Sequence, residues 1–298
     1  MFQDFYKNYE INYVNKRQSK VYLVIISPWM FTSVPWFAIT LGLLLNDKRK
    51  YIEFLWDDLE IDEISSEIKF SSRIQNFFIK SHIPFLSKYF IIHKLSSFSY
   101  SKLDNSDLKE LDRLSKINTI HKHKTSVLSS SNKIYTKKWY NHQLKNFFKI
   151  KFFFNKNKFD RVIMPGGVYG NTGLYFYMIK DKKSVCTFDS GLDRLIFCIN
   201  GITGYQHDVP IVISDKRLLS ISKSQYNYIK KITLEELDAR VKGKDTYNTQ
   251  LVSSQKNSKF DFDIVIPLNI TWDLPALGKH RFFDNDCDWV IETIDYIL

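Results

Sequence analysis

The stretch that decides the fold is Arg161-Val-Ile-Met-Pro-Gly-Gly-Val-Tyr-Gly-Asn-Thr-Gly173, followed after an apolar run by Ser184-Val-Cys-Thr-Phe-Asp-Ser-Gly191. Val162–Met164 is short, apolar and closed by a proline, which predicts a buried strand, and Val185–Phe188 predicts a second one. Leu174–Lys180 between them has helical spacing. Strand, glycine turn, helix and strand together form a βαβ unit, which binds ligands at the carboxyl ends of its strands.

The turn of this unit contains four glycines, and Asn171 lies among them. Their spacing matches neither the dinucleotide fingerprint nor the phosphate loop. One interpretation is a loop whose backbone N–H groups face an anionic or hydroxyl-rich ligand. The other is a tight loop that needs positive φ angles. The candidate binding residues here are Gly166, Gly167 and Asn171, and Asp189 at the end of the second strand is the candidate base.

An earlier segment repeats the pattern of strand, helix and strand. Val21–Ile26 is a continuous apolar run, Trp36–Leu45 has helical spacing, and Tyr51–Trp56 predicts a second strand. Ser27 and Trp29 follow the first strand, and Asp57 follows the second. All three are therefore predicted to lie at the carboxyl edge of the sheet, and Ser27 and Trp29 are candidate substrate-binding residues.

Residues 60–155 predict a mostly helical insertion on one side of the sheet. The segment Lys109–Lys158 holds thirteen Lys or Arg against two acidic residues, so it accounts for the whole formal net charge of +11. A basic helix over Lys133–Lys151 is expected to contact an anionic membrane surface. Nucleic acid is a weaker alternative, and the general richness of the chain in lysine is a third explanation. No nucleic-acid-binding signature is present.

Few features of the sequence indicate a cofactor or a cellular compartment. Three cysteines lie far apart, which favours a reducing compartment, and no secretory signal is visible, so a cytoplasmic protein is expected. His121 and His123 have no third ligand nearby in the sequence, and no metal or other cofactor is expected. The acidic run Asp284–Asp288 precedes a predicted helix and is interpreted as its N-terminal cap.

The last third of the chain is predicted to contain a short helix, a linker and the start of a second domain. Leu192–Cys198 is expected to be helical, and His207 beside Asp208 is a second candidate base. Residues 242–260 are polar and predict a linker. Residues 261–298 then predict one strand, one loop and one helix. Thirty-eight residues are too few for a second complete α/β domain, which needs about 100–150.

These segments together resemble bacterial capsule and surface-polysaccharide biosynthesis proteins, which are similar to GT-B glycosyltransferases. The resemblance is carried by Ser27-Pro28-Trp29-Met30, the Gly-Gly turn before Asn171, Asp189-Ser190-Gly191, Asn200-Gly201, and Pro267-Leu268-Asn269-Ile-Thr-Trp272-Asp273 with Leu277-Gly278. It implies an α/β fold with a Rossmann-like parallel sheet and helices on both faces over residues 1–241. A second, incomplete nucleotide-sugar-binding domain would begin at residue 261.

The resemblance also implies an activity: transfer of a sugar from a nucleotide-sugar to a growing capsular or lipopolysaccharide glycan or to a lipid-linked acceptor. Asp189 or His207 would deprotonate the acceptor hydroxyl. Asn269 and Asp273 would hydrogen-bond the donor, and Trp272 would stack on it. Because the second domain is short, the alternative is a non-catalytic or split half that needs a second chain.

Overall fold

The structure, a computed structural model, describes residues 19–29, 32–46, 49–59, 64–124, 128–179, 184–191, 194–203, 220–242 and 286–297. The chain forms two compact units, Met1–Val209 with Thr271–Leu298, and Pro210–Ile270. The first unit holds the sheet. The second contains helix α9 (Lys223–Val241), which the sequence pattern assigned to the same domain as the sheet.

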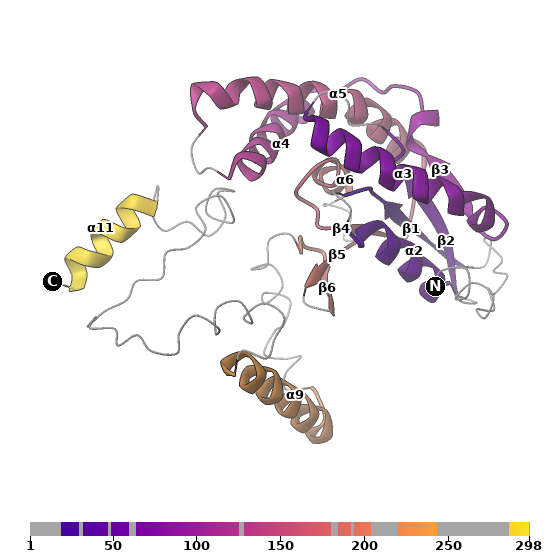
Figure 1. Cartoon of the computed structure of the whole chain (residues 1–298). Helices are drawn as coiled ribbons and strands as arrows, with labels where there is room; N and C mark the ends of the chain where they lie inside the picture. Colours follow the sequence, from indigo (N-terminus) through magenta and orange to yellow (C-terminus); the bar gives the residue numbers. More distant parts are fainter. Residues whose placement is uncertain are drawn as a thin grey trace. The chain divides into compact units, whose positions relative to one another are not determined.

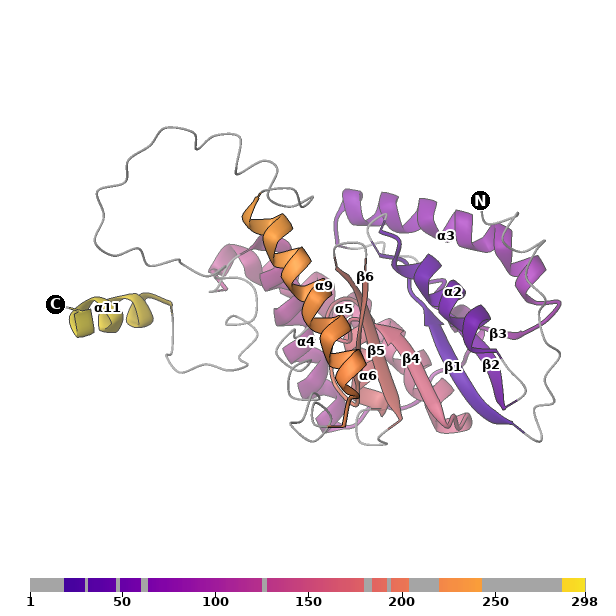
Figure 2. The same ribbon diagram turned by 90° about the horizontal axis from the view of Figure 1, so that it is seen from below.

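The sheet has six strands in the order β3-β2-β1-β4-β5-β6 (Figure 2). The first five run parallel, and β6 pairs antiparallel with β5. Continuous apolar runs form the central strands because both faces of a parallel sheet are buried. The strands are β1 (Lys20–Ile26), β2 (Lys50–Trp56), β3 (Ile91–Lys94), β4 (Arg161–Pro165), β5 (Val185–Gly191) and β6 (Arg194–Ile199).

Helices cover both faces of this sheet (Figure 1). In β1, Val24 and Ile26 face one core, and Leu23 and Ile25 face the other, because successive side chains alternate between faces. The first core is closed by α2 (Val34–Leu45) and α3 (Ser66–Leu86), and the second by α4 (Asn105–His123), α5 (Lys133–Lys156) and α6 (Thr172–Ile179). Short 3₁₀ turns, η2 (Leu95–Ser97) and η3 (Ser130–Asn132), precede α4 and α5.

The chain changes direction between β1 and β4. It first builds outward from β1 to β2 and β3, then returns to pair β4 with the other side of β1. The loops after β1 and β4 therefore leave the sheet toward opposite faces. A crevice at such a switch point is where open α/β sheets bind ligands.

Two expectations about secondary structure are wrong. Residues 60–155 are not an insertion on one side, since they supply strand β3 and place α3 and α5 on opposite faces. The expected helix over Leu192–Cys198 is wrong from residue 194 on, because Arg194–Ile199 is strand β6 and pairs antiparallel with β5.

A final helix, α11 (Asp286–Ile297), agrees with the predicted C-terminal helix. None of the helices in the described ranges is both long enough and apolar enough to cross a bilayer.

Candidate functional site

The carboxyl ends of β1, β2 and β4 meet at the switch point. Ile26 is paired with Trp56, so Ser27 and Asp57 leave the sheet side by side, and the Asp57 N–H donates to the Ile26 carbonyl at 3.0 Å. The turn after β4 reaches the same place through Asn171. Ser27, Trp29, Asp57 and Asn171 all line a small cavity here of about 20 Å³, together with Pro28, Leu59, Ser72, His142 and Gly170. A cavity of this size has room for about one water molecule.

The glycine turn is built from left-handed backbone. Gly166, Gly167 and Gly170 have φ angles of 53°, 90° and 58°. Gly170 also has no room for a side chain, because a Cβ there would lie 3.1 Å from the Trp29 ring. The turn therefore needs glycine for its conformation and for its close approach to the loop after β1.

Two of the glycine amides are used inside the protein rather than presented to a ligand. The Gly166 N–H donates to the Phe188 carbonyl at 2.8 Å, and the Gly170 N–H donates to Asn118 Oδ1 at 2.7 Å. Gln143 Nε2 in turn donates to the Gly170 carbonyl at 2.7 Å. At these two positions the expectation of exposed backbone N–H groups is wrong, because the Gly166 amide bonds to β5 and the Gly170 amide bonds to a side chain of α4.

A buried polar network joins β2, α5 and the glycine turn. Asn171 Nδ2 donates to Asp57 Oδ2 at 2.8 Å, and Asn146 Nδ2 donates to Asn171 Oδ1 at 3.1 Å. Asn146 Nδ2 also lies 3.0 Å from His142 Nε2. All four side chains are at most 8% exposed. Asn171 is thus held by two hydrogen bonds, one that it donates to Asp57 and one that it accepts from Asn146.

The surroundings of Asp57 in this site shift the pKa of its carboxyl group. Asp57 is 3% exposed, and its Oδ1 has no hydrogen-bond partner among the described residues. Burial raises the pKa of Asp57 to about 6, against the lowering effect of the hydrogen bond from Asn171. The hydroxyl of the fully buried Tyr175 lies beside Asp57 without the geometry of a hydrogen bond. Burial, and next the Asp57 charge, hold the pKa of Tyr175 well above its usual range. A carboxyl of pKa about 6 changes protonation state close to neutral pH, as a general acid or base does.

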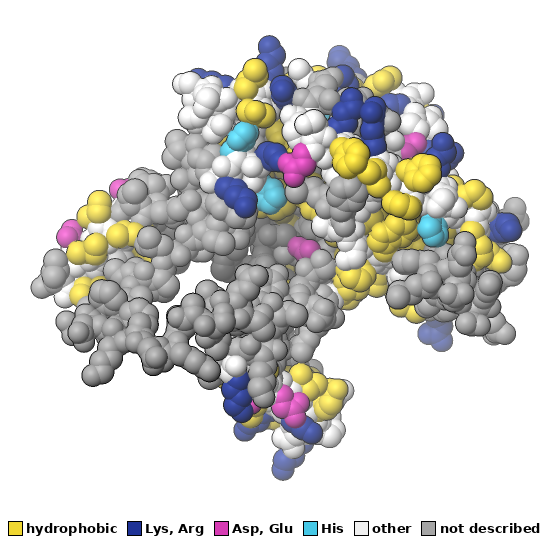
Figure 3. Space-filling view, viewed as in Figure 1, with side chains coloured by type: hydrophobic (Ala, Val, Ile, Leu, Met, Phe, Trp, Pro, Cys, Tyr) yellow, Lys and Arg dark blue, Asp and Glu magenta, His cyan; other side chains and the backbone are white. Residues whose placement is uncertain are grey.

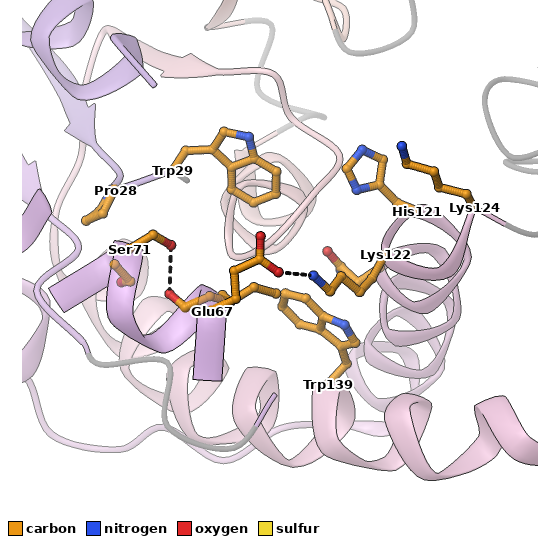
Figure 4. A pocket seen from close by; sticks show the side chains of 11 residues that line it. Pro28, Trp29, Glu67, Ser71, His121, Lys122, Lys124 and Trp139 are labelled. Atoms are coloured by element: carbon orange, nitrogen blue, oxygen red, sulfur yellow. Dashed lines mark hydrogen bonds and ion pairs between the residues drawn. The ribbon is translucent and has the colours of Figure 1, made fainter. Parts of the chain in front are cut away.

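A larger cavity of about 270 Å³ adjoins the first and shares Pro28, Trp29 and Ser72 with it. Trp29 and Trp139 lie on opposite sides of it (Figure 4). The Trp29 ring stacks on Tyr169, with centroids 6.3 Å apart, and the backbone N–H of Trp29 donates to Gln75 Oε1. Trp139 is 3% exposed, and its indole N–H is a buried donor with no partner in the described part of the chain.

The rim of the larger cavity is basic. His121, Lys122 and Lys124 come from the C-terminal end of α4, and Glu67 comes from the start of α3 (Figure 4). Lys122 Nζ bonds Glu67 Oε2 at 2.9 Å across the opening. One carboxylate therefore faces two lysines and a histidine, so the cavity is suited to a ligand with negative charge next to a flat or ring-shaped apolar surface.

The structure brings together some of the predicted site residues and separates others. Ser27, Trp29 and Asn171 surround one cavity, whereas Gly166, Gly167 and Asp189 line neither cavity. Asp189 lies at the end of β5, paired with Ile196 of β6. His207, Asn269, Trp272 and Asp273 lie outside the described residues.

His121 and His123 contact different aromatic rings, Tyr169 at 3.9 Å and Tyr135 at 4.2 Å between centroids. Within the described ranges, no three His, Cys, Asp or Glu side chains gather as a metal site would require.

Several residues of the site were not among the predicted ones. Asp57 was predicted to lie at the carboxyl edge of the sheet, because it directly follows a predicted strand, but it was not among the candidate bases. His142, Asn146 and Trp139 carry no such signal, since they sit within a helix whose sequence is dominated by lysine and phenylalanine. Their inward positions depend on which side of α5 packs on the sheet.

No protein-family model, curated protein or solved structure matches this chain, so its function must be argued from the chemistry of the site itself.

Proposed function

We propose that the chain is a glycosyltransferase of the GT-B kind, which transfers a sugar from a nucleotide-sugar to a capsular or lipopolysaccharide glycan. The observation that supports this most is the cavity of about 270 Å³ between Trp29 and Trp139, beside a carboxyl of pKa about 6. The strand order, with ligand-facing loops at the switch point, is that of Rossmann-like sheets and fits the same proposal.

The chemistry of the cavity suits a sugar joined to phosphate. Indole faces carry negative charge density that attracts the partly positive C–H groups of a sugar ring. The lysines of the rim suit phosphate oxygens, because hydrogen bonds between charged groups are the strong ones. Neither role needs a metal or a cofactor.

In the proposed reaction, the acceptor hydroxyl gives its proton to a base while its oxygen bonds the anomeric carbon. The bond from that carbon to the nucleoside diphosphate breaks, and the diphosphate leaves with the electron pair. Asp57 is our first candidate for the base, because it lines the small cavity that adjoins the larger one, and its raised pKa makes it a stronger base than an ordinary carboxylate. Asp189 and His207 remain the candidates that the sequence predicts.

We also propose that the acceptor is held at a membrane surface, with the exposed lysines of α5 turned toward anionic lipid. Only part of α5 is available for this. Lys149 Nζ donates to the carbonyls of Ser96 and Phe98, and Lys151 Nζ pairs with Asp104 and Asp107. Lys133, Lys137 and Lys145 are exposed.

A ligand titration tests the proposed function. UDP, CDP, GDP and their sugar derivatives are titrated against the chain while its thermal midpoint and tryptophan fluorescence are followed. One nucleotide-sugar should stabilise the chain saturably and change the emission of Trp29 and Trp139. Lys124→Ala should weaken that binding about fivefold, the equivalent of about 1 kcal/mol.

Lys116→Ala is the matched control, because Lys116 lies exposed on the same helix and pairs with Asp112 at 2.7 Å, away from the cavity. It should leave the affinity unchanged. A chain that responds to none of the six ligands does not bind the donor by itself. That result would favour the alternative, a non-catalytic half that requires a second polypeptide.

A further inference from the structure

Helix α3 exposes large aromatic side chains that the fold does not require. Phe70, Phe77 and Phe78 are 62%, 70% and 52% exposed. The opposite side of α3, which includes Ile79 and Ile83, is buried in the core on one face of the sheet. The helix is therefore apolar on two faces, one turned to the protein and one to solvent. A cluster of exposed aromatic residues on one face is a common mark of an interaction surface.

The three phenylalanines share one face because positions i, i+7 and i+8 align along a helix. Figure 3 shows hydrophobic side chains along the line that α3 follows in Figure 1, with Lys and Arg side chains close by. Arg73 and Lys80 each follow one of these phenylalanines by three positions, and both are exposed. They form a basic row along one side of the aromatic face.

Glu67 is the one acidic residue within α3, and it pairs with Lys122 at the cavity rim. A row of cations beside exposed aromatic rings is the pattern of helices that lie in the interface of an anionic bilayer. There the rings enter the boundary between headgroups and acyl chains, and the cations are attracted to the anionic headgroups.

We propose that this aromatic face of α3, made of Phe70, Phe77 and Phe78 with Arg73 and Lys80 beside it, docks the protein on an anionic lipid bilayer. It supplies the membrane contact that the proposed function calls for, but it rests on α3 alone. Lipid fits the face better than a second copy of this chain. In a two-fold dimer each patch would meet itself, which brings two basic rows toward each other.

Vesicle co-sedimentation tests the proposal with the whole chain. Vesicles of phosphatidylcholine alone are compared with an equal mixture of phosphatidylcholine and phosphatidylglycerol. The triple change Phe70→Ser, Phe77→Ser and Phe78→Ser should lower binding to the mixed vesicles by at least about tenfold, because three apolar side chains no longer leave water. Arg73→Ala with Lys80→Ala should lower it several-fold, and only with the anionic vesicles.

Matched controls separate docking from folding. Tyr226→Ser with Tyr228→Ser removes exposed aromatic rings from α9 and should leave vesicle binding unchanged. The triple variant should keep its thermal midpoint within about 2 °C of the original, because exposed side chains contribute little to stability. It should also keep its response to the nucleotide-sugar, so a failure of docking is distinct from a failure of the proposed activity.

Undiminished vesicle binding by the triple variant would overturn the proposal. It would also be overturned if the original chain ignored the mixed vesicles and formed a dimer that the triple change dissociates. A second copy would then be the partner of the aromatic face.

Discussion

Asp57 and Asp189 lie in the same local context but in different environments. Each follows the apolar run of a parallel strand, after Trp56 in one case and Phe188 in the other. Asp57 is 3% exposed, accepts a hydrogen bond from Asn171 and lines a cavity. Asp189 is partly exposed and lies outside both cavities.

The difference comes from the order of the strands. Asp57 ends β2, which neighbours β1 on one side of the switch point, and the glycine turn after β4 closes over it from the other side. Asp189 ends β5, one strand beyond β4, where β6 folds back antiparallel. Two carboxylates that look equivalent in the sequence are therefore placed unequally by the tertiary fold.

The largest expected effect comes from replacing Asp57 by asparagine and comparing it with the same change at Asp189. The pKa of Asp57 rises from 3.8 to about 6 on folding, so the folded chain holds this proton more tightly than the unfolded chain. The original chain therefore loses stability as the pH rises from about 4 to about 6. Asp57→Asn removes that loss and should gain up to about 3 kcal/mol over the original chain across this window.

Urea unfolding at a series of pH values measures the effect, and Asp189→Asn is its control. We expect a smaller change in stability for Asp189→Asn, because its side chain is partly in contact with solvent. In a transfer assay, the original activity should rise with pH through about 6, and Asp57→Asn should lower it at least about a hundredfold. Identical pH profiles for the two amide variants would contradict this contrast between the two carboxylates.

Asn171→Ala should have the next largest effect. It removes the donor to Asp57 Oδ2 and one of the two partners of Asn146 Nδ2, and a buried group left unsatisfied costs about 1–3 kcal/mol. It should also move the pKa of Asp57 further above 6, because the Asn171 hydrogen bond lowers that pKa.

The free energy of unfolding in urea measures the first effect, and its pH dependence measures the second. Asn141→Ala, an exposed substitution on α5, is the control and should be nearly neutral. A loss no larger than that of the control would mean that the network does not hold the site together.

Glu67→Gln should have the smallest effect. The hydrogen bond and charge of Lys122 lower the pKa of Glu67, but its side chain is 75% exposed, so solvent screens the pair. We expect the thermal midpoint at pH 7 to change by less than about 2 °C, similar to Asp112→Asn at the exposed pair with Lys116. A shift as large as that of Asn171→Ala would show that this surface pair, rather than the buried network, holds the rim.

Most of the parallel core could be predicted from hydrophobic pattern. The expected strands at Val21–Ile26, Tyr51–Trp56 and Val185–Phe188 agree with β1, β2 and β5 to within a few residues. Long apolar runs closed by proline or polar residues are unambiguous, because both faces of such strands must be buried.

The edges of the sheet were harder to predict. Strand β3 has only four residues and a half-exposed pattern. Strand β6 has a continuous apolar run over residues 195–199, but a short apolar run fits a helix as well as a strand. Both edge strands depend on the neighbour they pair with, which local sequence does not specify.

The exposure of the lysines on the basic helix α5 was also hard to predict from the sequence. Its sequence predicts a charged surface, yet Lys149 and Lys151 bond to groups from η2, Phe98 and the start of α4. Which lysines face solvent follows from how α5 packs, and the exposed face of α3, which is less basic in sequence, carries the larger aromatic cluster.

The sequence by itself determined that the chain forms parallel strands with glycine-bearing turns at their carboxyl ends, because apolar period and turn chemistry are local properties. Only the tertiary structure decided that Asp57, rather than Asp189, is buried beside Asn171 and next to the tryptophan-lined cavity. That choice depends on strand order and on helices packed from distant parts of the chain, and burial by those distant groups is what raises the pKa of one carboxyl.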